Sequence, residues 1–181
     1  MHKTPQEVLF TNARILDGSG QMPYSGSVRV RGNRIVQINR SIGSVSAGDA
    51  VVIDAAGATL MPGMTEAHTH FSWNDSSSLA GIQTMPLEEH VLWSAKVAHR
   101  YLKAGFTSCL GAACAKPRLD VVIRNAIESG QIPGPRYLAA SQEITVPGGL
   151  GDEMLPHLPF PDFSFGVVVN GSEDLRRVTR N

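Results

Sequence analysis

The sequence predicts an α/β fold in which strands and helices alternate, preceded by a smaller all-β region. Two stretches with the spacing of amphipathic helices, residues 86–104 and 117–129, alternate with short apolar runs typical of strands. The segment up to residue 60 consists of short apolar stretches divided by glycine-rich turns. A complete (β/α)₈ barrel needs about 250 residues, whereas this chain has 181. We therefore expect an incomplete small β domain over residues 1–60 and the first part of an α/β barrel, cut short, over residues 61–181.

Apolar runs separated by turn residues indicate the strands of the all-β region over residues 1–60. Apolar residues at 28–30 and 35–38 flank Arg31-Gly-Asn-Arg34, a pattern typical of a hairpin. Residues 41–49 are polar and rich in glycine and serine, which favours a loop. The apolar run at residues 50–53 then predicts a further strand.

Periodicity and turn residues define the elements of the barrel region. The first helix is predicted to start at Pro86, because proline suits the first turn, and to end at Gly105. The second is predicted to run from Pro117 to Gly130 by the same signals. The other predicted elements are strands at 59–71, 106–110 and 137–140, loops at 72–85 and 141–165, a short extended segment at 166–169 and a helix beginning at Ser172.

The most informative residues are His68 and His70, in the run Met61-Pro-Gly-Met-Thr-Glu-Ala-His-Thr-His70. Residues two apart on a strand share a face, so both imidazoles can bind one metal ion at about 2.0–2.1 Å each. Glu66 lies on that face one step deeper, where it could orient a ligand histidine, bind the metal, or pair with a basic group. An isolated His-x-His is more often an ordinary surface or core pair. The Pro62-Gly63 turn and the following helix–strand alternation favour the metal site.

Four blocks of sequence, in this order, resemble the amidohydrolase superfamily. The run from Pro62 to His70 is similar to its first-strand signature, Pro-Gly-x-x-Asp-x-His-x-His. The block at 8–18 resembles the opening strand of the small β domain of the family, and Ala104-Gly-Phe-Thr-Ser-Cys-Leu-Gly111 its second barrel strand. Ile132-Pro-Gly-Pro-Arg136, with the block at 144–152, resembles the imidazolonepropionase-like and Xaa-Pro dipeptidase-like branch.

The resemblance implies both a fold and a chemistry. The fold is a partial TIM (β/α)₈ barrel behind a small β-sandwich, holding one or two divalent ions, with zinc expected and manganese, cobalt or iron as alternatives. The implied activity is hydrolysis of a C–N bond in an amide, dipeptide, urea or carbamate by metal-activated water. The lysine, two further histidines and aspartate of the family have no match up to Asn181. We therefore expect the isolated chain to be inactive, and its partners to be a small-molecule substrate and the remainder of the barrel or further copies of the chain.

Two residues are candidates for the substrate pocket. Trp73 closely follows the histidine pair, and His157 lies in the proline-rich loop that could cover it. Two positions depart from the family pattern: Glu66 replaces the usual aspartate, and Leu150 stands where this branch often has a histidine. The remaining chemistry-bearing side chains are expected to be structural or exposed: His90, His99, Cys109 and Cys114.

Composition excludes several classes of function. Lysine plus arginine equals aspartate plus glutamate at 16 each, which gives no electrostatic footprint for nucleic acid or an acidic membrane. No apolar run approaches the length of a membrane span, and no secretory signal is visible. Two cysteines are too few for a disulfide framework, so a cytoplasmic location is expected. A cupin-type metal oxygenase also uses His-x-His on a strand, but it predicts further strands where this sequence predicts helices.

Overall fold

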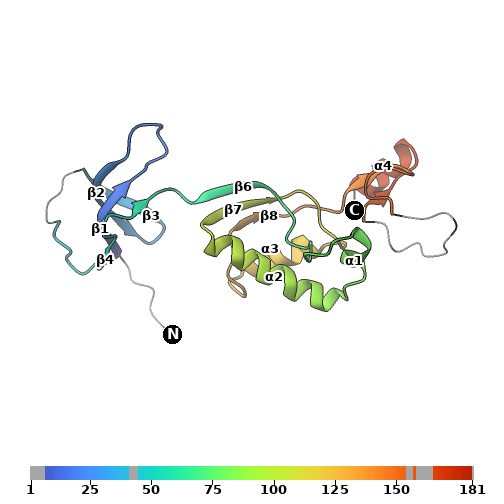
Figure 1. Ribbon diagram of the computed structural model, residues 1–181, viewed down its shortest axis with the longest axis horizontal. Helices are drawn as coiled ribbons and strands as arrows, with labels where there is room; N and C mark the ends of the chain where they lie inside the picture. The colour runs from blue at the N-terminus through green and yellow to red at the C-terminus, as the bar shows by residue number, and fades with distance from the viewer. Residues whose placement is uncertain (1–6, 41–44, 154–156, 158–164, 181) are drawn as a thin grey trace. The chain divides into compact units, whose positions relative to one another are not determined.

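A computed structural model describes residues 7–40, 45–153, 157 and 165–180 of the chain. The chain divides into two compact units, Met1–Pro62 and Gly63–Asn181 (Figure 1). Over its described residues the first unit contains strands alone, whereas the second alternates strands with helices.

The first unit is built on one five-stranded sheet. Its strands are β1 (Glu7–Ile15), β2 (Tyr24–Arg31), β3 (Arg34–Asn39), β4 (Val51–Asp54) and β5 (Thr59–Leu60). The order is β3-β2-β1-β4, with β5 also pairing with β1. The predicted hairpin is present, because Arg31 of β2 pairs with Arg34 of β3. Since the described part of the unit has a single sheet, the second layer of the expected β-sandwich is not confirmed.

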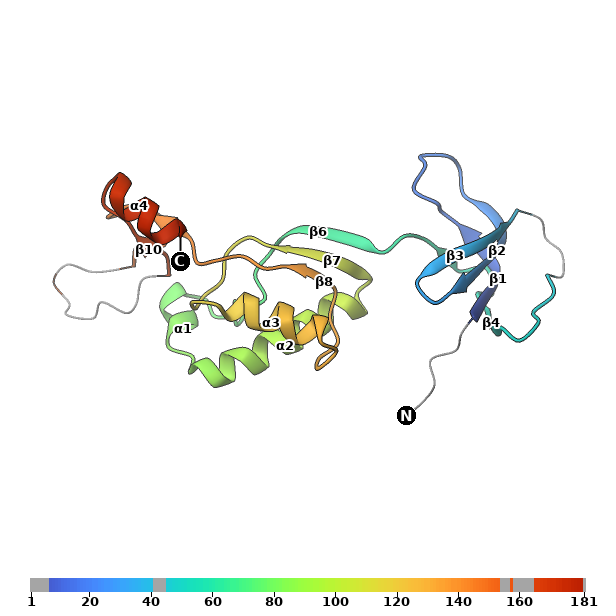
Figure 2. The ribbon, with the colours of Figure 1, turned by 180° about the vertical axis from the view of Figure 1, so that it is seen from behind.

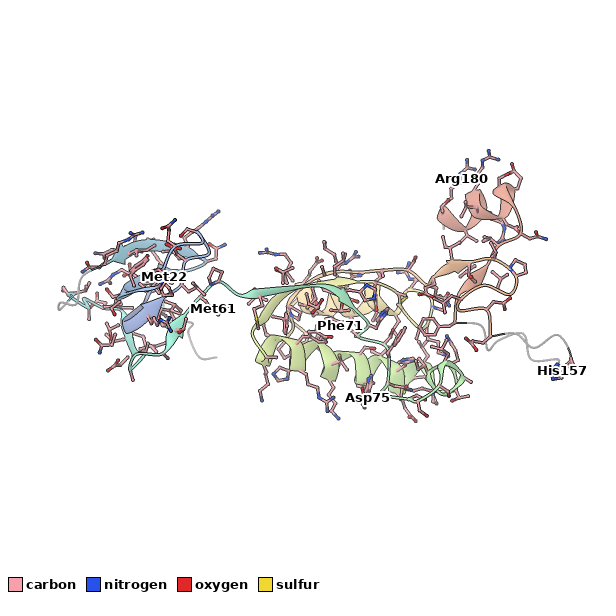
Figure 3. The ribbon with its side chains drawn as sticks, turned by 45° about the horizontal axis from the view of Figure 1, so that its top comes forward. Met22, Met61, Phe71, Asp75, His157 and Arg180 are labelled. Atoms are coloured by element: carbon pink, nitrogen blue, oxygen red, sulfur yellow. The ribbon has the colours of Figure 1, made fainter. Side chains whose placement is uncertain are left out.

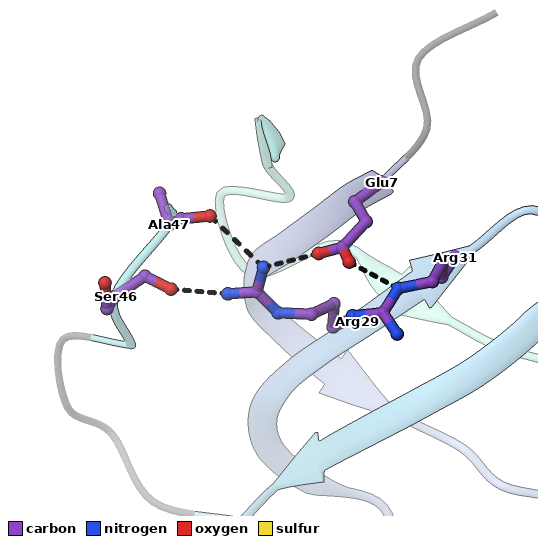
Figure 4. A network of polar contacts seen from close by, with 5 residues as sticks. All are labelled: Glu7, Arg29, Arg31, Ser46 and Ala47. Carbon is purple, nitrogen blue, oxygen red and sulfur yellow. Dashed lines mark hydrogen bonds and ion pairs between the residues drawn. The ribbon is translucent and has the colours of Figure 1, made fainter. Parts of the chain in front are cut away.

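Buried aliphatic residues and one ion-pair cluster stabilise this sheet. Its core consists of Ala13, Ile15 and Val28. Near the start of β1, the carboxylate of Glu7 contacts the guanidinium groups of Arg29, at 2.9 Å, and Arg31, at 2.5 Å (Figure 4). These two arginines hold the pKa of Glu7 below its usual value. Arg29 also donates to the carbonyl of Ala47, which fixes the segment before β4.

The second unit contains a three-stranded parallel sheet in the order β6-β7-β8. Its elements are β6 (Met64–Thr69), α1 (Leu79–Gln83), α2 (Leu87–Lys103), β7 (Phe106–Gly111), α3 (Leu119–Glu128), β8 (Arg136–Leu138), β9 (Ile144–Thr145), β10 (Val167–Val168) and α4 (Ser172–Thr179). Helices α2 and α3 lie on the same face of the sheet (Figure 2). Strands β9 and β10 form a separate parallel pair.

An aromatic cluster joins the sheet to these two helices. Phe71 is fully buried directly after the histidine pair (Figure 3). Its ring stacks on Tyr137 of β8, with centroids 4.2 Å apart, and lies 5.2 Å from the ring of Tyr101 in α2. Ala98, Cys109 and Ile123 complete the buried cluster. The residue that follows the histidine pair is therefore packed against both strand β8 and helix α2.

The observed helices follow the predictions closely, and three local expectations are wrong. The predicted loop at 141–165 contains the short strand β9, which pairs with β10. The predicted strand at 59–71 is two strands: β5 pairs with β1 of the first unit, and β6 begins only at Met64. Pro62 has no amide hydrogen to continue a ladder, which accounts for the break. The predicted loop at 72–85 contains α1, whose first turn is capped by the hydroxyl of Ser78. In the described residues, no helix is long and apolar enough to cross a membrane.

Candidate metal centre

The histidine pair lies at the carboxyl end of β6. His68 is near the end of the strand and exposed, and His70 follows its last residue and is half-buried. The two rings are nearly perpendicular, at 79°, with centroids 5.0 Å apart. Their Nε2 atoms approach to 3.2 Å. Active sites of α/β barrels form at this end of the strands.

The separation of the two Nε2 atoms fits shared binding of one metal ion. Two nitrogens each bonded at about 2.0–2.1 Å, with an angle of about 100–110° at the metal, are about 3.1–3.4 Å apart. The observed 3.2 Å lies in this range. Among residues 7–40, 45–153, 157 and 165–180, however, no group of three or more His, Cys, Asp or Glu side chains could hold a metal. The geometry of the pair therefore fits two of the ligands that a metal site would need.

The tautomer of His70 is set by the backbone. Its Nδ1 lies 3.1 Å from the carbonyl oxygen of Ala113. A carbonyl oxygen only accepts, so Nδ1 carries the hydrogen and the lone pair of Nε2 faces His68. Donation from the other ring nitrogen to a backbone carbonyl is the usual arrangement for a metal-binding histidine.

The segment after β7 holds the segment after β6 through a series of hydrogen bonds. The amide of Ala112 donates to the carbonyl of Thr69 at 2.9 Å, and the amide of Ala115 donates to the hydroxyl of Ser72 at 2.8 Å. Small side chains permit this approach, and Ala113, Cys114 and Ala115 are at most 1% exposed. Sequence reasoning missed this supporting role, although the run of small residues after β7 was visible.

Trp73 forms one wall of the site. Its ring stacks on the imidazole of His70, with centroids 3.9 Å apart and planes 17° from parallel. Phe165 also contacts the Trp73 ring, in an edge-to-face arrangement with centroids 5.4 Å apart. The indole Nε1 of Trp73 is buried and has no hydrogen-bond partner among the described residues. The stack restricts rotation of the His70 ring.

Glu66 and His157 stand apart from the ring nitrogens in the described structure. The carboxylate of Glu66 accepts from the backbone amide of His68 at 3.2 Å. No hydrogen bond from either histidine ring to Glu66 is present in the described part of the chain. His157 is exposed, and most of the residues beside it fall outside the described ranges. Figure 3 shows His157 well away from Phe71, which directly follows the histidine pair.

A buried polar pair lies beneath the strand ends. The hydroxyl of Tyr137 donates to Oδ2 of Asp120 at 2.5 Å, and the amide of Ala140 donates to the same oxygen at 3.3 Å. The other oxygen, Oδ1, has no partner among the described residues. Burial raises the pKa of Asp120, while the Tyr137 bond opposes that shift. A Cβ on Gly111 would lie only 2.6 Å from the Tyr137 hydroxyl, so glycine is required there.

The two cysteines are buried free thiols. Burial raises the pKa of Cys109, and that of Cys114 to about 11. Neither thiol is therefore an activated nucleophile.

Comparison with known proteins decides the family. The profile of the amidohydrolase family matches residues 59–177, which include the histidine pair and all elements from β5 to most of α4. The chain belongs to the amidohydrolase family. The resemblance found in the sequence blocks is thereby confirmed.

Curated amidohydrolase relatives match a short part of the chain. A dihydroorotase of Wolbachia sp. subsp. Drosophila simulans is 38% identical over 69 residues, covering 38% of this chain and 15% of that protein. A 5′-deoxyadenosine deaminase of Methanothermobacter thermautotrophicus is 40% identical over 68 residues, covering 37% of this chain and 15% of that protein. The chain thus spans 15% of the length of these two relatives.

Solved amidohydrolase structures match nearly the whole chain. A prolidase complexed with N-methylphosphonate-L-proline has a TM-score of 0.81 and 25% identity, covering 96% of this chain and 43% of that one. A Xaa-Pro dipeptidase with methionine in its active site has a TM-score of 0.77 and 26% identity, with the same coverage of 96% and 43%. These likenesses confirm the predicted α/β barrel fold in part, since the chain spans less than half of either structure.

Proposed function

We propose that this chain contributes two metal ligands to a hydrolase that cleaves a C–N bond through metal-activated water. One observation carries the proposal: the Nε2 atoms of His68 and His70 lie 3.2 Å apart at the carboxyl end of a parallel strand. Membership of the amidohydrolase family supports it. The metal is a divalent ion, with zinc expected from two imidazole ligands and manganese, cobalt or iron as alternatives.

Each residue of the site has a distinct task in this proposal. His68 and His70 bind the ion through Nε2, and Ala113 keeps the Nε2 of His70 deprotonated by accepting from Nδ1. When bound, the metal lowers the pKa of a water molecule to about 7 and polarises the substrate carbonyl. Trp73 excludes water from one side of the His70 ring.

The substrate is proposed to be a small amide-like molecule. Two structural neighbours are named as a prolidase and a Xaa-Pro dipeptidase, and two sequence relatives as a dihydroorotase and a deaminase. Dipeptides ending in proline and cyclic amides are therefore the first compounds to test, with urea and carbamate compounds next.

The remaining ligands come from outside the described residues. Two imidazoles leave a tetrahedral site half-filled, and no third His, Cys, Asp or Glu side chain joins them in the described ranges. We propose that the rest of the barrel, supplied by a longer protein or by another chain, completes the centre. The helices α2 and α3 replace the strands that a cupin-type oxygenase would need, so that alternative is not favoured.

The test is metal content and hydrolysis in the intact protein and in two single variants. His68→Ala and His70→Ala are expected to bind zinc more weakly, so that less zinc remains after dialysis, and to lose at least about a hundredfold in kcat/KM on a responsive substrate, because each removes a metal ligand. His99→Ala is the matched control, since His99 is exposed on α2. Wild-type zinc content and activity in both histidine-pair variants would overturn the proposal.

A further inference from the structure

Helix α2 places a fully buried histidine against the loop that follows the metal pair. His90 is 0% exposed and its Nε2 hydrogen-bonds to the carbonyl oxygen of Ser72. Because a carbonyl accepts, Nε2 carries the hydrogen of this bond. Nδ1 itself is buried and has no partner in the described part of the chain.

One turn further along α2, a second ring donates to the next carbonyl. Nε1 of Trp93 lies 3.1 Å from the carbonyl oxygen of Trp73. Residues three apart on a helix share a face, so His90 and Trp93 present two N–H groups side by side. They bind the consecutive carbonyls of Ser72 and Trp73, which belong to the two peptide groups on either side of the Trp73 Cα, and so fix the backbone of Trp73.

The backbone of Trp73 determines where the wall of the site stands. The amide of Trp73 donates to the carbonyl of His70 at 3.2 Å, and its ring lies flat on the His70 imidazole. The hydroxyl of Ser72 also accepts from the amide of Ala115. The loop is therefore held both by α2 and by the segment after β7.

Packing alone does not account for a histidine at position 90. An apolar ring would fill the same space without burying a nitrogen that has no partner, and unpartnered buried polar atoms are costly. The benefit of the imidazole lies in its one directed bond to Ser72.

We propose that His90 and Trp93 are positioning residues for the metal centre: they fix the backbone on both sides of Trp73 so that the Trp73 ring holds the His70 imidazole in its metal-binding orientation. This inference rests on the proposed function of His70 as a ligand. Its effect is exerted through the backbone, and neither residue touches the metal or the substrate.

The test compares two replacements of His90 in the intact protein. His90→Phe keeps a ring and removes the donor, whereas His90→Gln retains an N–H near the position of Nε2. Zinc affinity is measured by competition with a chelator, and thermal stability by the melting temperature. Loss of a group that orients a ligand costs about 10–100-fold in metal affinity. We expect about a tenfold loss for His90→Phe, recovery to within about threefold for His90→Gln, and no change for the control His99→Phe.

A second readout works without any metal. Ring current from Trp73 shifts the carbon-bound protons of His70 upfield in the NMR spectrum of the zinc-free protein. His90→Phe is expected to reduce that shift, and His90→Gln and His99→Phe to preserve it. Trp93→Phe, which removes the second donor, is expected to reduce it as well.

The two readouts separate the two proposals. If the wild-type protein binds no zinc but His90→Phe still moves the His70 protons, the proposed function fails while the positioning by His90 stands. If both His90 variants lower the melting temperature by the same amount but leave zinc affinity and the chemical shifts of the His70 protons unchanged, His90 is only structural and the inference is overturned.

Discussion

The buried pair of Tyr137 and Asp120 offers a direct test of what supports the floor of the site. Replacing Tyr137 by phenylalanine removes one hydroxyl and keeps the ring, so the stack on Phe71 at 4.2 Å is retained. The fully buried carboxyl of Asp120 then keeps one donor, the amide of Ala140 at 3.3 Å. A hydrogen bond to a charged group contributes about 1.5–3 kcal/mol. We therefore expect Tyr137→Phe to lower the free energy of unfolding by about 2 kcal/mol.

The assay is urea unfolding followed by tryptophan fluorescence, since Trp73 and Trp93 both lie in the second unit. The urea concentration at the midpoint of unfolding should fall, while the slope of the free energy of unfolding against urea concentration stays unchanged. Tyr101→Phe is the matched control, because its hydroxyl has no hydrogen bond recorded among the described residues, and it should cost less than about 0.5 kcal/mol. Equal costs for the two variants would refute the role of the Tyr137–Asp120 bond.

The cost of Tyr137→Phe should also depend on pH. Burial raises the pKa of Asp120 above its ordinary value, so the folded state binds the proton more tightly than the unfolded state. Stability is thus lost as the pH rises through the folded pKa, and the Tyr137 bond limits that loss. The variant should be penalised most at neutral pH and least in acid. A cost that grows as the pH falls would contradict this assignment.

Three further predictions concern the surroundings of the site. Gly111→Ala should lower the free energy of unfolding by about 1–3 kcal/mol through overpacking. The added Cβ would lie 2.6 Å from the Tyr137 hydroxyl and 2.7 Å from Oδ2 of Asp120. Urea unfolding measures the loss. Phe71→Ala should cost about 3–5 kcal/mol in the same assay, as expected for a fully buried aromatic ring. Burial first, and then the charge of Lys116, lowers the pKa of His90 below 6.5, against the opposing bond to Ser72. The contribution of His90 to stability is therefore complete above about pH 6.5 and is lost as the pH falls through the folded pKa of His90. His90→Gln should flatten the dependence of the free energy of unfolding on pH below about pH 6.5. An unchanged pH dependence would contradict this prediction.

Local signals in the sequence were sufficient for much of the fold. The helices α2 and α3 were predicted because proline, glycine and apolar periodicity agree at their ends. The strand at 59–71 was misjudged because apolar content cannot reveal that Thr59 and Leu60 pair with β1. The helix α1 was missed because it has only five residues, so its capping serine resembles an ordinary loop residue.

The site was predictable only where its residues are close in sequence. The spacing of His68 and His70 on a strand predicts that they meet, because strand geometry is fixed over two residues. The partner of His70, the carbonyl of Ala113, lies 43 positions away and depends on strand pairing. The contact of His90 with Ser72 likewise depends on how α2 packs, so the residue was expected only to pack or lie at the surface. Such contacts are set by tertiary structure, and single-residue patterns do not encode them.

In the proposed metal centre, the Nε2 atoms of His68 and His70 bind the same metal ion. X-ray absorption at the zinc edge of the intact, zinc-loaded protein measures this most directly, because imidazole ligands give a recognisable scattering pattern at about 2.0–2.1 Å. We predict that the contribution of one imidazole disappears from this pattern in His68→Ala and likewise in His70→Ala. The pattern should be unchanged in His99→Ala. A zinc spectrum identical to that of the wild-type protein in both histidine-pair variants would contradict it.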